Sequence, residues 1–151
     1  MELHEQLREA LELQVIEADG PGAAQVLQGA ILDHTAVDVG DGMLDAAAVA
    51  LRRMVLETNE TMVASDLMAR LALDGTLPDE RIELLTDTML MAAATAGGVR
   101  PSVEALINRE GVEDAMFGLW LGLLTVLRVV AIALDQTEAE LVEDVLVALE
   151  P

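Results

Sequence analysis

The sequence predicts an all-α protein, a single domain over residues 1–151 that folds as a bundle of about six to eight helices. The chain is 53% apolar yet has one Trp and one Phe, and Leu, Ala, Val and Met supply most of its apolar residues. Leu, Ala and Met favour helices, whereas strands favour aromatic and β-branched side chains. No segment alternates strictly between apolar and polar residues, as a half-buried strand does. We therefore expect helices around one core, which a chain of this length can bury.

Turn signals in the first third separate the expected helices. Apolar residues at helical spacing predict a first helix over residues 2–17 and a second over 23–35. Gly and Pro at 19–22 end one helix and start the next. The Gly- and Asp-rich residues 37–42 read as a turn, in which Asp41 caps the helix that follows.

The middle of the chain is expected to contain three further helices. The helical pattern runs from residue 43 to 73, with Gly75 as a stop after it. Pro78 and the acids behind it open another helix, which ends at the glycines 97–98. Residues 101–109 read as a short helix.

The last two helices include the most apolar segment of the chain. Residues 112–134 are predicted to form a long helix at the centre of the core. Its residues 115–134 carry one charge, Arg128, and are long enough to span a bilayer. The flanks are acidic and lack the basic cluster that orients membrane helices, so we expect no membrane span. Thr137 and Glu140 then form a capping box ahead of the final helix.

Polar residues of the long helix fall within one sector, which contains Arg128. This sector is either a thin strip facing solvent or a site where a buried Arg128 meets a carboxylate or anchors an anion in a pocket. Gly118 and Gly122 permit close approach of a second helix. Trp120 beside them is suited to anchoring a subunit interface.

Methionines join the leucine-rich faces of several predicted helices. Met54 and Met89 are examples. Met fills irregular space in cores and also lines adaptable grooves. These residues are therefore either core filler or part of a groove for a partner helix or a pocket for an apolar ligand.

The net charge is strongly negative. There are 28 acidic and 8 basic residues, giving −20, and the basic residues are all Arg. Such a surface repels phosphate, so we expect no direct binding to nucleic acid or to an anionic membrane. The acidity is explained by solubility or the composition of the source, or else by a match to a basic protein partner. Without Cys or a basic, apolar N-terminal segment, a cytoplasmic location is expected.

The chain lacks the residues that most catalytic and metal-binding sites require. The chain has no Lys, Cys or Tyr, so phosphate-loop lysines, Schiff bases and thiolates are excluded. His4 and His34 have no second ligand at helical spacing. We predict a non-enzymatic protein that uses no cofactor and no metal.

Three functions remain open. The first is a helical protein-interaction module that self-associates, with a homodimer as the expected assembly because a monomer this apolar has difficulty hiding its surface. The second is an acidic neutraliser of a basic protein, of the immunity, antitoxin or DNA-mimic type. The third is a binder of a small apolar or acidic ligand between helices. The candidate interface or pocket residues are Trp120, Gly118, Gly122, Arg128, Met54 and Met89.

Overall fold

The computed structural model describes residues 2–58 and 79–149. All its regular elements are helical in these ranges, which confirms the predicted all-α class with seven α-helices and one π-helical segment. In chain order they are α1 (Leu3–Leu11), η1 (Glu12–Ile16, the π-helical segment), α2 (Gly20–Asp33), α3 (Ala36–Thr58), α5 (Asp79–Ala96), α6 (Val103–Glu110), α7 (Val112–Ala133) and α8 (Glu138–Leu149).

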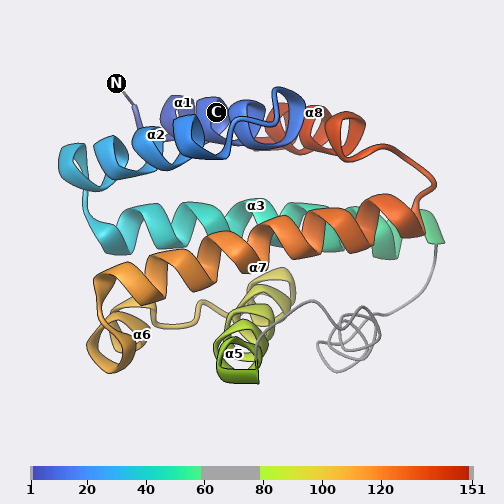
Figure 1. Cartoon of the computed structure of the whole chain (residues 1–151). Coiled ribbons are helices and arrows are strands. Elements are labelled where there is room, and N and C mark those ends of the chain that lie inside the picture. Colours follow the sequence, from blue (N-terminus) through green and yellow to red (C-terminus); the bar gives the residue numbers. More distant parts are fainter. Residues whose placement is uncertain (1, 59–78, 150–151) are drawn as a thin grey trace.

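The helices form three layers (Figure 1). Helices α3 and α7 lie side by side in the middle, with α1, α2 and α8 on one side and α5 and α6 on the other. The long apolar helix is at the centre as predicted, because α7 contacts α3, α5, α6 and α8. It is long and apolar enough to cross a membrane, but 61% of its most apolar window is buried against other parts of the chain. Its apolar side chains therefore supply much of the core.

The predicted turn at residues 37–42 is wrong. Helix α3 starts at Ala36, and the hydroxyl of Thr35 accepts a hydrogen bond from the backbone N–H of Asp38 at 3.1 Å, so Thr35 caps the helix instead of Asp41. Gly40 and Gly42 lie inside the helix. A Cβ on Gly40 would lie 2.6 Å from Val103 Cγ1, and one on Gly42 would lie 2.5 Å from Leu7 Cδ1. These glycines make room for neighbouring helices and do not break α3.

Other boundaries agree more closely with the sequence. Asp19 caps α2 by accepting a hydrogen bond from the N–H of Gly22 at 3.0 Å. The Thr137 N–H donates to the Glu140 carboxylate at 3.2 Å and the Glu140 N–H to the Thr137 hydroxyl at 3.1 Å, which confirms the capping box. Helix α3 is described as far as Thr58, so the predicted continuation to residue 73 lies outside the described residues.

Two glycine-to-alanine variants test whether Gly40 is required for helix packing. G40A inserts a methyl group against Val103, and overpacking of this kind costs about 1–3 kcal/mol, from which the better helix propensity of Ala recovers about 1 kcal/mol. We expect the free energy of unfolding to fall by up to about 2 kcal/mol in urea titrations. The control is G29A in α2, where nothing lies within 4 Å of the added Cβ. It should be stabilised by about 0.5–1 kcal/mol, and equal stability of the two variants would contradict the packing role.

Candidate functional site

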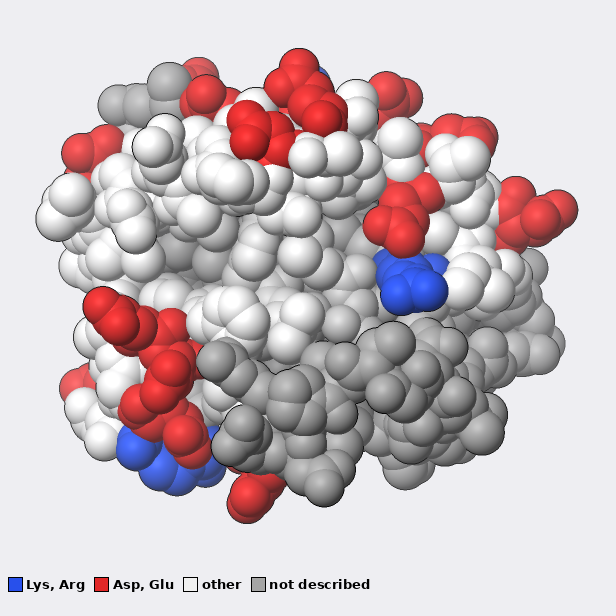
Figure 2. Space-filling view, viewed as in Figure 1, with Lys and Arg blue, Asp and Glu red and all other residues white. Residues whose placement is uncertain are grey.

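A groove of about 740 Å³ lies between α2 and the N-terminal half of α7. Met43 of α3, which is almost fully buried, also lines it and forms its base. Figure 2 shows this region as an uncharged band with acidic side chains above it and at its lower left, and a basic group at its right end. The wall residues are Ala24, Leu27, Gln28, Ile31 and Leu32 of α2, and Val112, Glu113, Asp114, Met116, Phe117 and Trp120 of α7.

Both walls are single stripes along a helix. The α2 set and the α7 residues Glu113, Met116, Phe117 and Trp120 recur at three- and four-residue spacing, which brings their side chains to one face of each helix; Val112 and Asp114 widen the α7 wall at its first turn. Helix α7 follows α6 through Gly111, whose φ of +90° is readily available only to glycine. Helix α2 packs on α1, η1 and α3, and α7 packs on α3, α5, α6 and α8. Both walls therefore contact α3, and its residue Met43 forms the base that separates them.

The groove displays large apolar side chains to solvent. Leu32 is 85% exposed, Phe117 47% and Val112 45%, and Trp120 is half-buried. Phe117 and Trp120 are the only two aromatic residues of the chain. Aromatic side chains provide much of the energy at protein interfaces. This concentration makes the groove the strongest candidate for a binding surface.

The predicted residues Gly118 and Gly122 face into the chain, away from the groove. A Cβ on Gly118 would lie 2.8 Å from Leu84 Cγ, and one on Gly122 would lie 2.7 Å from the Thr88 hydroxyl. Both neighbours belong to α5 and are themselves four residues apart. The glycines therefore permit the expected close helix approach, but between α7 and α5 of the same chain. Trp120 lines the groove, whereas Gly118 and Gly122 do not.

The remaining predicted residues lie elsewhere. Met54 and Met89 are 1% and 0% exposed and belong to the core, so their side chains line no open surface. Met43 and Met116 line the groove in their place. Arg128 is exposed on α7, which argues against a buried ion pair, but Thr125 in the same sector is buried, so the sector does not face solvent along its whole length.

A second hollow of about 310 Å³ lies among α1, α3, α7 and α8. Its lining is mostly leucine, with His4 and Asp45 as the polar side chains. Arg128 lines neither hollow, so the pocket in which Arg128 fixes an acid group does not form at either of them.

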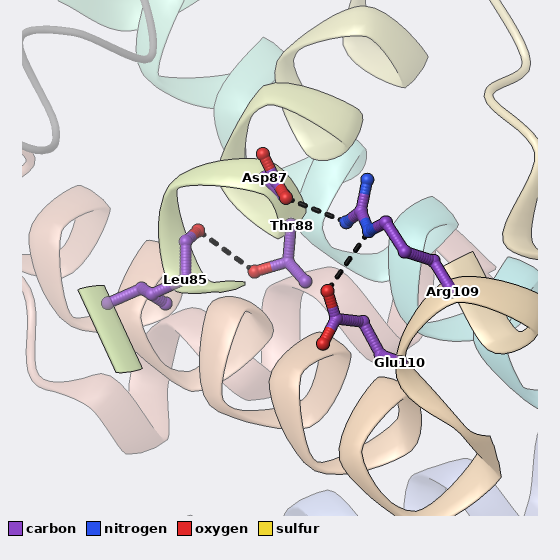
Figure 3. Close-up of polar contacts among 5 residues, drawn as sticks. All are labelled: Leu85, Asp87, Thr88, Arg109 and Glu110. Atoms are coloured by element: carbon purple, nitrogen blue, oxygen red, sulfur yellow. Dashed lines mark hydrogen bonds and ion pairs between the residues drawn. The ribbon is translucent and has the colours of Figure 1, made fainter. Parts of the chain in front are cut away.

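Several arginines connect helices in the described part of the chain. Arg109 of α6 donates to Asp87 of α5 at 2.7 Å and to the adjacent Glu110 at 3.0 Å (Figure 3). The hydrogen bond to Glu110, together with the charge of Asp87, raises the pKa of Arg109. Arg53 of α3 pairs with Asp144 of α8 at 3.0 Å.

Another arginine joins α3 to the end of α5. Arg52 donates to the backbone carbonyls of Thr95 and Ala96 at 2.8 and 3.0 Å, at the C-terminus of α5. Carbonyls in the last turn of a helix lack partners within the helix, and a cation there also interacts favourably with the helix dipole. These contacts fix the position of α5 beneath the central layer.

Asp41 lies in a cluster of charges at the start of α3. Arg100 contacts Asp45 at 3.0 Å and Asp41 at 3.8 Å. Burial raises the pKa of the Asp41 carboxyl; Arg100 opposes this shift, while Asp45 and Asp38 add to it. Folding therefore disfavours the ionised form of Asp41.

Neither metal chemistry nor a known relative points to another site. Across residues 2–58 and 79–149, no group of three or more His, Asp or Glu side chains is placed to hold a metal ion. Comparisons with protein-family models, with curated proteins and with solved structures give no match. The groove between α2 and α7 therefore stands on its geometry alone.

The raised pKa of Asp41 gives a pH-dependent stability. Above the folded-state pKa the ionised carboxylate destabilises the fold, and below the unfolded value of 3.8 the group is protonated in both states, so the penalty is absent. We expect D41N to melt at a higher temperature than the wild type at neutral pH. The gap should close as the pH falls through the folded-state pKa towards 3.8.

Arg100 provides the companion variant. R100Q removes the charge that lowers the pKa of Asp41, so its stability should fall more steeply than that of the wild type between acidic and neutral pH. The double variant D41N/R100Q should lose this extra slope. A D41N protein that is less stable than the wild type by the same amount at every pH would contradict the assignment. Thermal unfolding followed by circular dichroism measures each case.

Proposed function

We propose that this protein is a non-enzymatic protein-interaction module that binds a helical segment through the groove between α2 and α7. The observation that supports this most directly is the exposure of Leu32 and Phe117 beside Trp120 on the walls of that groove. Two helix faces separated by an apolar base provide a surface into which an amphipathic helix can pack its apolar face.

The dimensions suit a short helix. Each wall stripe covers eight residue steps, from Ala24 to Leu32 and from Val112 to Trp120, or about 12 Å at the helical rise of about 1.5 Å per residue. An occupying helix would contact the walls over about two turns. Apolar anchors at positions i, i+3 or i+4, and i+7 would therefore reach both walls.

Self-association through the same groove is the second candidate, as expected from the apolar composition. The exposed side chain of Leu32 is available to enter the groove of a second copy. Gly118 and Gly122 do not support a dimer, because they pack against α5 of the same chain and do not form an outward face. The homodimer stays a prediction that light scattering at micromolar concentration tests.

Intrinsic fluorescence gives a direct test, because Trp120 is the only Trp in the chain and lines the groove. Titration with a neutral amphipathic helical peptide, with Leu and Phe on one face and Gln elsewhere, should shift the Trp120 emission to shorter wavelength as water is displaced. L32Q/F117Q should weaken this binding by at least about tenfold, since it removes the exposed apolar walls.

The matched control is I132Q/V147Q. Ile132 and Val147 are 68% and 66% exposed but lie outside the groove. This variant should bind the peptide like the wild type, and circular dichroism should show both variants folded. Equal binding by L32Q/F117Q and the wild type, or the absence of any peptide binding, would contradict the proposal.

A further inference from the structure

We infer that the occupant of the groove is a basic amphipathic helix of another protein, with apolar anchors on one face and Arg or Lys beside them. This inference rests on the proposed function and adds the charge of the partner. It follows from the charges around the groove, from the pairing of acids elsewhere in the chain and from the symmetry that a dimer would require.

The walls carry negative charge only. Residues 20–33, which form α2, and residues 112–127 of α7 contain Asp33, Glu113 and Asp114 and no basic residue. Glu113 and Asp114 line the groove and are exposed. In Figure 2 the uncharged band has acidic side chains over the upper helices and an acidic group at its lower left end, while the basic group at its right end lies beside acidic atoms. A helix in the groove would therefore have acids beside it.

These two acids differ from the acids that hold the fold together. Asp87, Asp144 and Asp45 are paired with arginines on other parts of the chain. Within the described ranges, Glu113 and Asp114 form no salt bridge. They lie in the first turn of α7, where the helix dipole stabilises negative charge. Their charge is thus available to a cation on a bound partner.

A second copy of the chain fits these charges poorly. A two-fold dimer through the groove would place the same patch on both sides of the interface, and because residues 20–33 and 112–127 contain no basic residue, the acids of each copy would meet no cation in the groove of the other. Each chain also carries a net charge of −20, and like charges across an interface disfavour association. A basic helix meets both the apolar and the acidic part of the groove.

The experiment uses three synthetic helical peptides of about 14 residues, or roughly four turns. They share one apolar face of Leu and Phe and carry Lys, Gln or Glu at the remaining positions. Each is titrated into the 151-residue chain with Trp120 emission as the readout. We expect the Lys peptide to bind roughly tenfold more tightly than the Gln peptide, and the Glu peptide to bind most weakly.

Two double variants, which each remove two negative charges, show which acids attract the Lys peptide. E113Q/D114N should weaken the Lys peptide by about three- to fivefold and change the binding of the Gln peptide by less than about twofold, because the Gln peptide has no charge to pair with these acids. E138Q/E143Q removes two exposed acids of α8 outside the groove and should change the affinity by less than about twofold. Raising the salt from about 0.1 M to about 1 M shortens the Debye length from about 10 Å to about 3 Å, so the Lys and Gln peptides should converge.

The outcomes separate the two proposals. If all three peptides bind equally, the groove binds helices and the basic partner is wrong. If none binds, the proposed function itself fails. A Lys peptide that binds L32Q/F117Q as well as the wild type indicates ionic adsorption outside the groove and overturns the inference. Concentration-dependent Trp120 emission without peptide, with a dimer in light scattering that L32Q/F117Q abolishes, would assign the groove to a second copy.

Discussion

The packing of α7 against its neighbours is the constraint on which the rest of the fold depends. Its apolar side chains can be buried only if helices approach from several directions, and glycine makes two of these approaches close. Gly118 and Gly122 accept Leu84 and Thr88 of α5 on one side of α7. Gly40 accepts Leu119 of α7, together with Val103 at the start of α6. With α5 and α6 held here, the side of α7 towards α2 remains open, and that side forms the groove wall.

Ion pairs add to this packing, but they contribute less to stability than the apolar contacts do. The ion pairs of the arginines are partly exposed, and pairs of this kind contribute only about 0–1 kcal/mol each. Their contribution is to orientation, because each joins two elements that the apolar contacts alone would allow to slide: α3 to α8 through Arg53, and α6 to α5 through Arg109. These two arginines are thus used within the chain, where they link its helices.

The sequence predicted the helices well where the evidence for them is local. The capping box at Thr137 and the apolar run of α7 depend on residues close together in the chain, and both are confirmed. Gly40 depends on a distant contact: whether a glycine breaks a helix or admits a neighbour is decided by Val103, more than sixty residues later. The groove is similar. Trp120 stood out by residue type, whereas Leu32 looks like any helical leucine until the positions of α2 and α7 are known.

The position of Met43 has a consequence for how the binding surface can vary. The two walls of the groove belong to helices that are separated by the base, and Met43 is the α3 side chain that forms that base. Met is unbranched and adapts its shape to the space available. A substitution of Met43 by a shorter or longer side chain would therefore change the depth of the groove. It would leave unchanged every residue that a partner touches at the rim. Selectivity for bulky or slender helices can thus be changed independently of the acidic and aromatic contacts.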